Sequence, residues 1–183
     1  MKIVLISGSR ADRGGLESVF ESLKVLGFEP EWYSAEGVLN AGQLLLPNFD
    51  IAIALGDRFE ILRAVVELYI KGVAIAHLSG GDITEGSQDD CMRHAISKLS
   101  HLHFVTNKEA ARRVIQMGEE PWRVHNVGYP GIDRLQELMP LELAKSQAGI
   151  VSYDDFLLVV WHPDTLADAD ENLRQVQILT RAL

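Results

Sequence analysis

The sequence predicts an α/β protein with a doubly wound parallel sheet that helices cover on both faces. Three segments, IVLIS, IAIAL and VAIAHL, are nearly unbroken apolar runs, as in strands buried on both sides of a parallel sheet. Runs of this kind alternate with helical segments, which indicates βαβ units with right-handed crossovers. Each expected strand also ends in a polar or glycine-rich turn, the place where sheets of this class bind small molecules.

The order of elements follows from the apolar periodicity. We expect a six-stranded sheet with strands at residues 2–7, 29–33 (the weakest), 51–55, 73–78, 102–106 and 123–127. Helical segments alternate with them at 14–26, 59–71, 87–100, 108–117 and 132–138, and a short helix is expected over 36–46.

The last part of the chain has a different organisation. Residues 140–153 have the composition of a connector, and an expected strand at 156–161 and a helix over 168–183 follow it. One strand and one helix cannot bury an apolar face alone. We therefore expect a first domain over 1–140. Residues 141–183 form either a linker with the first strand–helix unit of an incomplete second domain, or an addition packed on the first.

Composition excludes several classes of protein. The chain has 183 residues, 47% of them apolar and 23% charged, which is typical of a soluble globular domain. The net charge of −9 and the scattered basic residues argue against polymeric nucleic acid as a partner. No apolar run is long enough to cross a membrane. The single cysteine, Cys91, fits a reducing, cytoplasmic setting.

The first polar turn, SGSRAD at residues 7–12, joins the first strand to the first helix. Its small residues let backbone N–H groups and a helix N-terminus face an anion, and Arg10 could clamp a phosphate or a carboxylate. The alternative is a plain loop in which Asp12 caps the helix.

The third strand ends in GDR at residues 56–58. Asp57 could act as a general acid or base, or could orient a sugar hydroxyl. It could equally form a surface ion pair with Arg58, or cap the helix that begins at Phe59.

The fourth strand runs into HLSGGD at residues 77–82. Gly80 and Gly81 permit positive φ and the close approach of a ligand. His77, inside an apolar strand, is interpreted as a satisfied core residue rather than a catalytic one. Glu85 adds a carboxylate to the loop that follows.

A helix then opens with Asp89 and Asp90, for which capping is the strong alternative to catalysis. Arg93 shares a helix face with Asp90. The histidines at 94, 101 and 103 lack the spacing of metal ligands, so no metal and no cofactor is expected. GYPG at 128–131 and His162 follow the later strands; His162 is a candidate acid–base group or a turn residue.

Together these motifs resemble the UDP-N-acetylglucosamine 2-epimerase family, whose glycosyltransferase-B fold is built from two Rossmann-like halves. GSRAD, GDRFE, GGDITEG, DDCMRHAISKLSHLHF, RVIQMGEEPWRVHNVGYPGID and WHPDT occur in the family's order. The block from Asp89 to Phe104 is similar to the hydrolysing branch, which makes N-acetylmannosamine or related sugars for sialic-acid-type synthesis. The other branch would have GDT in place of GDR.

The resemblance implies a reaction in which UDP is eliminated across C1 and C2 to give a glycal, and water then adds to release the C2-inverted sugar. It implies that Asp57 and an acid of the Asp89–Asp90 pair transfer protons. It also implies that Arg10 contacts the diphosphate, and that the catalytic His162 lies near it. The residues that contact or support the UDP-sugar would be Arg58, Ser79, Gly80, Gly81, Glu85 and Arg93. Members are often dimers, which leaves a homodimer open.

Three departures from the family pattern shape the expectation. Ser79 stands where several members have a catalytic glutamate, so the role of base passes to another group such as Glu85 or Asp82. The interval between GSRAD and GDR is shorter than in the family, and the chain stops early in the second domain. The leading hypothesis is therefore a hydrolysing 2-epimerase. The alternatives are a truncated, non-catalytic domain of the family and an epimerase for a UDP-2,4-diacetamido sugar.

Overall fold

The computed structural model describes residues 1–36, 47–137, 140–147, 149 and 158–183. It divides into two compact units, Met1–Asp133 and Arg134–Leu183. The expected helix over 36–46 lies, from residue 37 onward, outside the described residues. Every described helix is too short or too polar to cross a membrane.

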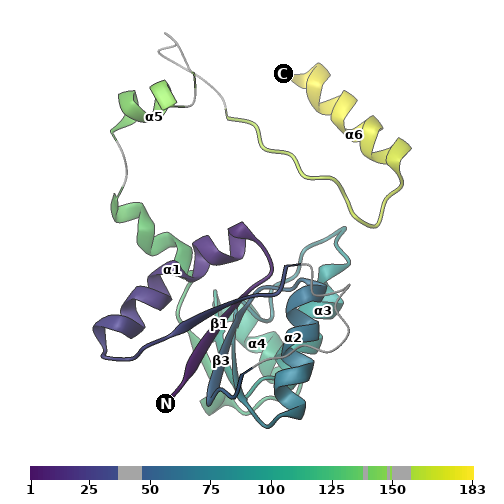
Figure 1. Cartoon of the computed structure of the whole chain (residues 1–183). Coiled ribbons are helices and arrows are strands. Elements are labelled where there is room, and N and C mark those ends of the chain that lie inside the picture. The colour runs from purple at the N-terminus through teal and green to yellow at the C-terminus, as the bar shows by residue number, and fades with distance from the viewer. Residues whose placement is uncertain (37–46, 138–139, 148, 150–157) are drawn as a thin grey trace. The chain divides into compact units, whose positions relative to one another are not determined.

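The first unit holds a six-stranded, fully parallel sheet, which confirms the predicted fold class (Figure 1). Its strands lie in the order β2-β1-β3-β4-β5-β6. Their bounds are β1 Ile3–Ser7, β2 Glu31–Ser34, β3 Ile51–Leu55, β4 Ala74–Leu78, β5 Leu102–Val105 and β6 Val124–Asn126. The order reverses between β1 and β3, and loops beyond the carboxyl ends of strands at such a point bind ligands in this class of sheet.

The helices of the first unit follow the strands as the periodicity predicts. They are α1 Arg10–Val25, α2 Phe59–Ile70, α3 Asp89–Leu99 and α4 Lys108–Gln116, with a short 3₁₀ segment at Pro121–Arg123. A second 3₁₀ segment, Pro130–Glu137, begins in the first unit and ends in the second. Helix α1 begins four residues earlier than expected because Ser9 caps it: the Ser9 hydroxyl accepts the N–H of Asp12 at 3.3 Å. The segment expected as a helix at 132–138 is 3₁₀ up to Glu137.

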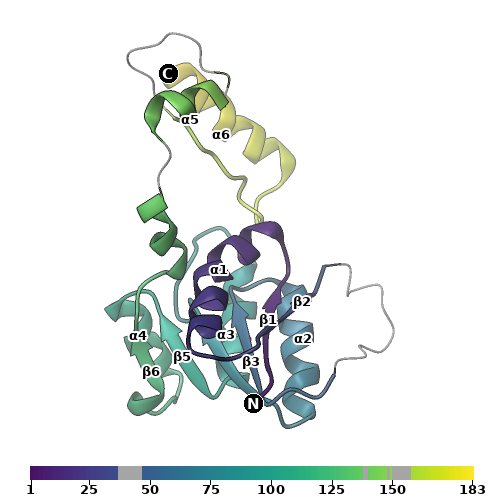
Figure 2. The same cartoon turned by 60° about the vertical axis from the view of Figure 1, so that its left-hand side comes forward.

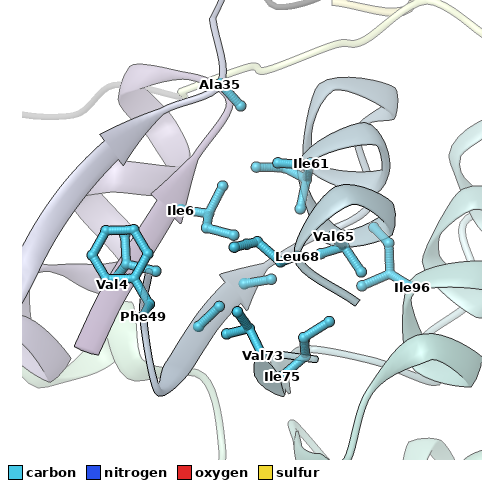
Figure 3. Close-up of a cluster of buried hydrophobic side chains, with 13 residues drawn as sticks. Val4, Ile6, Ala35, Phe49, Ile61, Val65, Leu68, Val73, Ile75 and Ile96 are labelled. Carbon is cyan, nitrogen blue, oxygen red and sulfur yellow. The ribbon is translucent and has the colours of Figure 1, made fainter. Parts of the chain in front are cut away.

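Alternate residues of each strand face opposite layers, so the sheet has two cores. On one face Val4 and Ile6 pack with Ile61, Val65 and other residues of α2, and with Ile96 of α3 (Figure 3). On the other face Ile3, Leu5 and Leu55 pack against Leu16 of α1. Figure 2 shows α1 on its own side of the sheet, which confirms helical cover on both faces.

The second unit contains the helices α5 Leu141–Gln147 and α6 Ala169–Ala182. Asp168 caps α6 by accepting the N–H of Glu171 at 2.8 Å, and the predicted C-terminal helix is confirmed. The strand expected at 156–161 is wrong for its described part, because residues 158–161 have no strand conformation. A strand needs a hydrogen-bonded neighbour, and no described strand pairs with this run.

Candidate active site

The loops after β1, β3, β4 and β5 meet at the carboxyl edge of the sheet. At the end of β1, the carboxylate of Asp12 reaches back and accepts the N–H of Gly8 at 3.0 Å. Together with the Ser9 cap, this bond from the residue before the N-cap fixes the start of α1. Arg10 is thereby the first residue of α1, with an exposed side chain.

Asp12 lies beside the site, whereas its sequence pattern predicted only that it caps the helix. Burial raises the pKa of the Asp12 carboxyl, although its hydrogen bonds and the charge of Arg58 act in the opposite direction. A Cβ placed on Gly56 would lie 3.8 Å from Oδ1 of Asp12, so this carboxyl reaches the end of β3. The Ser-x-x-Asp spacing was the available signal, because it turns the acid back toward the strand end.

Asp57 neither pairs with Arg58 nor caps α2, the two structural roles that the sequence left open for it. Arg58 pairs instead with Glu60 at 3.2 Å, and the N-cap of α2 has no side-chain hydrogen bond. The partner of Asp57 is Arg93, which lies 36 residues away on α3. Long-range pairing of this kind has no signature in a single sequence.

Arg93 is the centre of the site. Its side chain is only 6% exposed. One terminal nitrogen, Nη2, donates to Oδ2 of Asp57 and, at 3.1 Å, to the hydroxyl of Thr84. The other, Nη1, donates to Oδ1 of Asp90 at 2.5 Å and to the carbonyl of Asp82 at 2.7 Å. The guanidinium thus holds two carboxylates and the 82–84 loop in one arrangement, as its planar fork of donors allows.

Asp89 and Asp90 open α3 but do not cap it. Gln88 is the N-cap residue and makes no side-chain cap bond. Asp90 accepts the N–H of Thr84 at 2.9 Å in addition to its pair with Arg93. Asp89 lies half-buried beside Arg58: the hydrogen bond with Glu60 raises the pKa of Arg58, and the charges of Asp12 and Asp89 add to this.

The loop after β4 is tightly built. Ser79 has φ +62°, the one positive φ among described residues other than glycine, and its buried hydroxyl has no hydrogen-bond partner among them. A Cβ on Gly80 would come within 2.7 Å of the Ser97 hydroxyl, and Gly81 has φ +81°. Packing within the protein therefore already requires both glycines. Ligand contact by these three residues stays a prediction, as it does for the exposed Glu85.

Both oxygens of Asp82 are engaged by the turn after β5. Thr106 donates to Oδ2 at 2.7 Å, and the amide of Asn107 donates to Oδ1 at 3.0 Å. These bonds join the β4 and β5 loops. Asp82 is thus a structural tie between loops, which makes it a poorer candidate for a base than Asp57 or Asp90.

Two strand histidines, His77 of β4 and His103 of β5, are buried. His77 is fully buried with both ring nitrogens partnered, which confirms its interpretation as a core residue. Burial lowers the pKa of His77 to about 4, so the ring is neutral at pH 7. His103 bonds to Glu119 at 3.2 Å, and burial lowers its pKa as well. Within the described residues no three His, Cys, Asp or Glu side chains are grouped for a metal ion.

An apolar cavity of about 360 Å³ lies on the opposite face of the sheet from His77. Its walls come from α1, the sheet and the GYPG turn, with Leu23, Phe104 and Tyr129 among them. Pro130 of that turn is tied to α1, because the Ser18 hydroxyl donates to its carbonyl at 3.0 Å. None of the predicted acids lines this cavity. His162 belongs to the second unit, where it is exposed.

Comparison with known proteins identifies the family. The family model described as UDP-N-acetylglucosamine 2-epimerase matches residues 40–183. The chain belongs to this family. Polysialic acid biosynthesis protein P7 of Escherichia coli is 34% identical over 68% of this chain and 32% of its own length. The GDP/UDP-N,N'-diacetylbacillosamine 2-epimerase (hydrolyzing) of Campylobacter jejuni is 34% identical over 73% of this chain and 35% of its own length.

Solved structures of 2-epimerases share the fold. UDP-GlcNAc 2-epimerase from Neisseria meningitidis bound to UDP-GlcNAc superposes with a TM-score of 0.67 at 14% identity, over 80% of this chain and 52% of that one. The enzyme from Methanocaldococcus jannaschii gives a TM-score of 0.65 at 16% identity, over 85% of this chain and 54% of that one. The chain spans about a third of the length of the curated 2-epimerase relatives that it matches.

Proposed function

We propose that the protein carrying this sequence is a hydrolysing 2-epimerase, which converts UDP-N-acetylglucosamine and water to UDP and N-acetylmannosamine. The observation that carries the proposal is the arrangement around Arg93, which brings Asp57 from β3 and Asp90 from α3 together at the carboxyl edge of the sheet. Membership of the 2-epimerase family and a relative named as hydrolyzing support the reaction type.

The first step is an elimination. A carboxylate removes the proton from C2, the bond from C1 to the UDP oxygen breaks, and its electron pair leaves with UDP while C1 and C2 become a double bond. Asp57 and Asp90 each bind Arg93 through one oxygen, Oδ2 and Oδ1 respectively. The second oxygen of either carboxylate is then available to take the proton.

The second step hydrates the glycal. The oxygen of water bonds to C1, one water proton passes to a carboxylate, and C2 receives a proton on the face opposite to the one that lost it. Two acids with different surroundings suit this exchange of roles. We assign Asp57 and Asp90 to these transfers, with the half-buried Asp89 beside them.

The leaving diphosphate needs positive charge. Arg10 stands at the N-terminus of the 16-residue helix α1, where backbone N–H groups also favour an anion. Arg58 completes the proposed anion contacts of the first unit, and Ser79, Gly80, Gly81 and Glu85 line the sugar side. His162, in the second unit, is proposed as an acid–base group. We place the enzyme in the cytoplasm, in sialic-acid-type synthesis, in keeping with its one free and exposed cysteine, Cys91.

The test is product analysis with the full gene product that carries these residues. Incubated with UDP-N-acetylglucosamine in D₂O, it should release UDP and N-acetylmannosamine with deuterium at C2, because C2 is reprotonated from solvent. Asp57→Asn should abolish both signals. A protein that releases no UDP from any UDP-N-acetylhexosamine is instead a non-catalytic member of the family.

A second candidate substrate is a UDP-2,4-diacetamido sugar. Two relatives, from Campylobacter jejuni and Legionella pneumophila, are named diacetylbacillosamine 2-epimerases, and each is 34% identical to this chain. The same catalytic groups would serve, because the reaction at C1 and C2 is unchanged. Comparing kcat/KM for the two UDP-sugars in one assay decides between them.

A further inference from the structure

Both backbone polar groups of Gly56 are held by the neighbouring strand β4. Gly56 has φ +89°, a left-handed conformation in which β3 turns toward Asp57. Its N–H donates to the carbonyl of Leu78 at 3.3 Å, and its carbonyl accepts from Nε2 of His77 at 2.8 Å. The His77 ring therefore fixes the peptide unit that carries Asp57.

The second ring nitrogen of His77 binds α3. A carbonyl oxygen can only accept, so Nε2 carries the proton and Nδ1 is an acceptor. The hydroxyl of Ser97 donates to Nδ1 at 3.0 Å. His77 and Ser97 are both fully buried, which makes loss of either hydrogen bond costly.

These contacts form a closed ring with the acid of the site. Ser97 follows Arg93 by four residues, one turn along the same face of α3. Arg93 pairs with Asp57, which is covalently next to Gly56. The ring thus runs from Gly56 through His77 and Ser97 to Arg93 and Asp57. We call this set of five residues the His77 network.

We propose that His77 is a positioning residue for the reaction: it holds the Asp57 carboxylate in register with Arg93 by binding the Gly56 carbonyl and α3 at the same time. The inference rests on the proposed function of Asp57. An apolar side chain could fill the same buried space, but it would leave the Gly56 carbonyl and the Ser97 hydroxyl without partners. The polar ring at this point of an otherwise apolar strand is thereby explained.

The test separates the two nitrogens of His77. His77→Gln ends at the depth of Nε2 and retains a donor for the Gly56 carbonyl, whereas His77→Asn ends at the depth of Nδ1 and reaches only Ser97. Both variants remove the ring, so both lose packing. In the full gene product, we expect His77→Asn to lower kcat for UDP release about tenfold or more with little change in KM, and His77→Gln to stay within about threefold of wild type.

A second pair of variants is less disruptive and therefore less prone to unfold the protein. Ser97→Ala removes the bond that orients the His77 ring. Ser100→Ala removes a comparable buried bond at the end of α3, which the Ser100 hydroxyl donates to the Ile96 carbonyl at 2.7 Å. This bond is not part of the His77 network. We expect Ser97→Ala to lower kcat by about threefold or more and Ser100→Ala to leave it unchanged at similar stability. Equal kcat for Gln and Asn at position 77, or for the two alanine variants, would overturn the proposal.

A spectroscopic measurement keeps this inference distinct from the proposed function. If the wild-type protein releases no UDP, the proposed reaction fails, but the position of Asp57 can still be followed. The NMR signals of the Arg93 guanidinium report its pair with Asp57. They should shift or broaden in His77→Asn and stay near their wild-type positions in His77→Gln. Unchanged signals in His77→Asn would show that His77 does not position Asp57.

Discussion

Arg93 shows at the scale of one residue why arginine rather than lysine occupies a site between two acids. Its two terminal nitrogens reach Asp57, Asp90, a hydroxyl and a carbonyl at once. A lysine presents one nitrogen and cannot span both carboxylates in fixed directions. Because Arg93 is buried, the loss of one of these contacts leaves a buried polar group without its partner, which is costly.

We expect Arg93→Lys to lower the free energy of unfolding by about 2–3 kcal/mol and UDP release by about 100-fold or more, because one carboxylate is left unpaired and both lose their direction. Urea unfolding and steady-state kinetics measure the two effects. Arg112→Lys is the matched control, since Arg112 pairs with Glu109 where both side chains are more than half exposed. A similar loss in the control would contradict the assignment.

The depressed pKa of His77 predicts a pH dependence of stability. Burial is the largest cause, the charges of His103 and Arg93 act in the same direction, and the Gly56 carbonyl and Asp57 oppose it. The unfolded chain takes up a proton below pH 6.5, whereas the folded chain does so only below about pH 4. Stability is therefore complete above pH 6.5 and falls as the pH drops through this window.

Urea unfolding at pH 7 and pH 5 should show the effect. Wild type should lose about 2 kcal/mol more than His77→Gln over this interval, since the glutamine does not titrate. The difference between the proteins isolates His77 from other groups, including His103, whose pKa is also lowered. Parallel pH profiles would show that the pKa of His77 is not lowered in the folded protein.

A variant of Ser79 allows its effect on stability to be measured separately from its predicted contact with the substrate. Its φ of +62° is unfavourable for serine and acceptable for glycine, and its buried hydroxyl has no partner among the described residues. We expect Ser79→Gly to raise the free energy of unfolding by about 1 kcal/mol. If the hydroxyl binds the sugar, KM rises in the same variant; an unchanged KM would remove Ser79 from the binding residues.

At the scale of elements, the β4–α3 loop packs so closely that Gly80 has no room for a methyl group. A Cβ there would meet the Ser97 hydroxyl at 2.7 Å and Nδ1 of His77 at 2.8 Å. We expect Gly80→Ala to cost about 1–3 kcal/mol. Adding Ser97→Ala should return part of this, so that the two changes are not additive in urea unfolding. Strict additivity would show that the loop relaxes elsewhere.

The sequence predicted elements better than contacts. All six strands and the four long helices of the first unit were predictable because apolar periodicity is local, and the polar turns after the strands lie at the carboxyl edge of the sheet. The run at 158–161 was misread as a strand, since an apolar run indicates a strand only when a neighbour pairs with it. Asp57 and Asp90 stay predictions as site acids, because the sequence marks them only as candidates. The pair of Asp57 with Arg93 and the contacts through His77 depend on tertiary packing, which a single sequence does not show.

At the scale of the whole molecule, all three clusters of buried apolar residues among the described residues lie in the first unit. The second unit buries no residue of α6 and exposes Leu158, Leu173 and Ile178. We expect residues 1–133 to fold alone, with a cooperative thermal transition within a few degrees of that of the 183-residue chain. Limited proteolysis should cut first after residue 133. A fragment that stays unfolded would show that the core depends on the second unit.

The close packing of Gly80 against His77 and Ser97 also constrains how the sequence can diverge. A change at any one of these three positions disturbs the other two, so single replacements are disfavoured even though none of the three carries the chemistry. A methyl at position 80 is less strained after the hydroxyl at 97 has gone, although Nδ1 of His77 would still lie 2.8 Å from it, whereas the reverse order passes through a more strained intermediate. Evolution at this site is therefore path-dependent, and substitutions here should arise in a fixed succession.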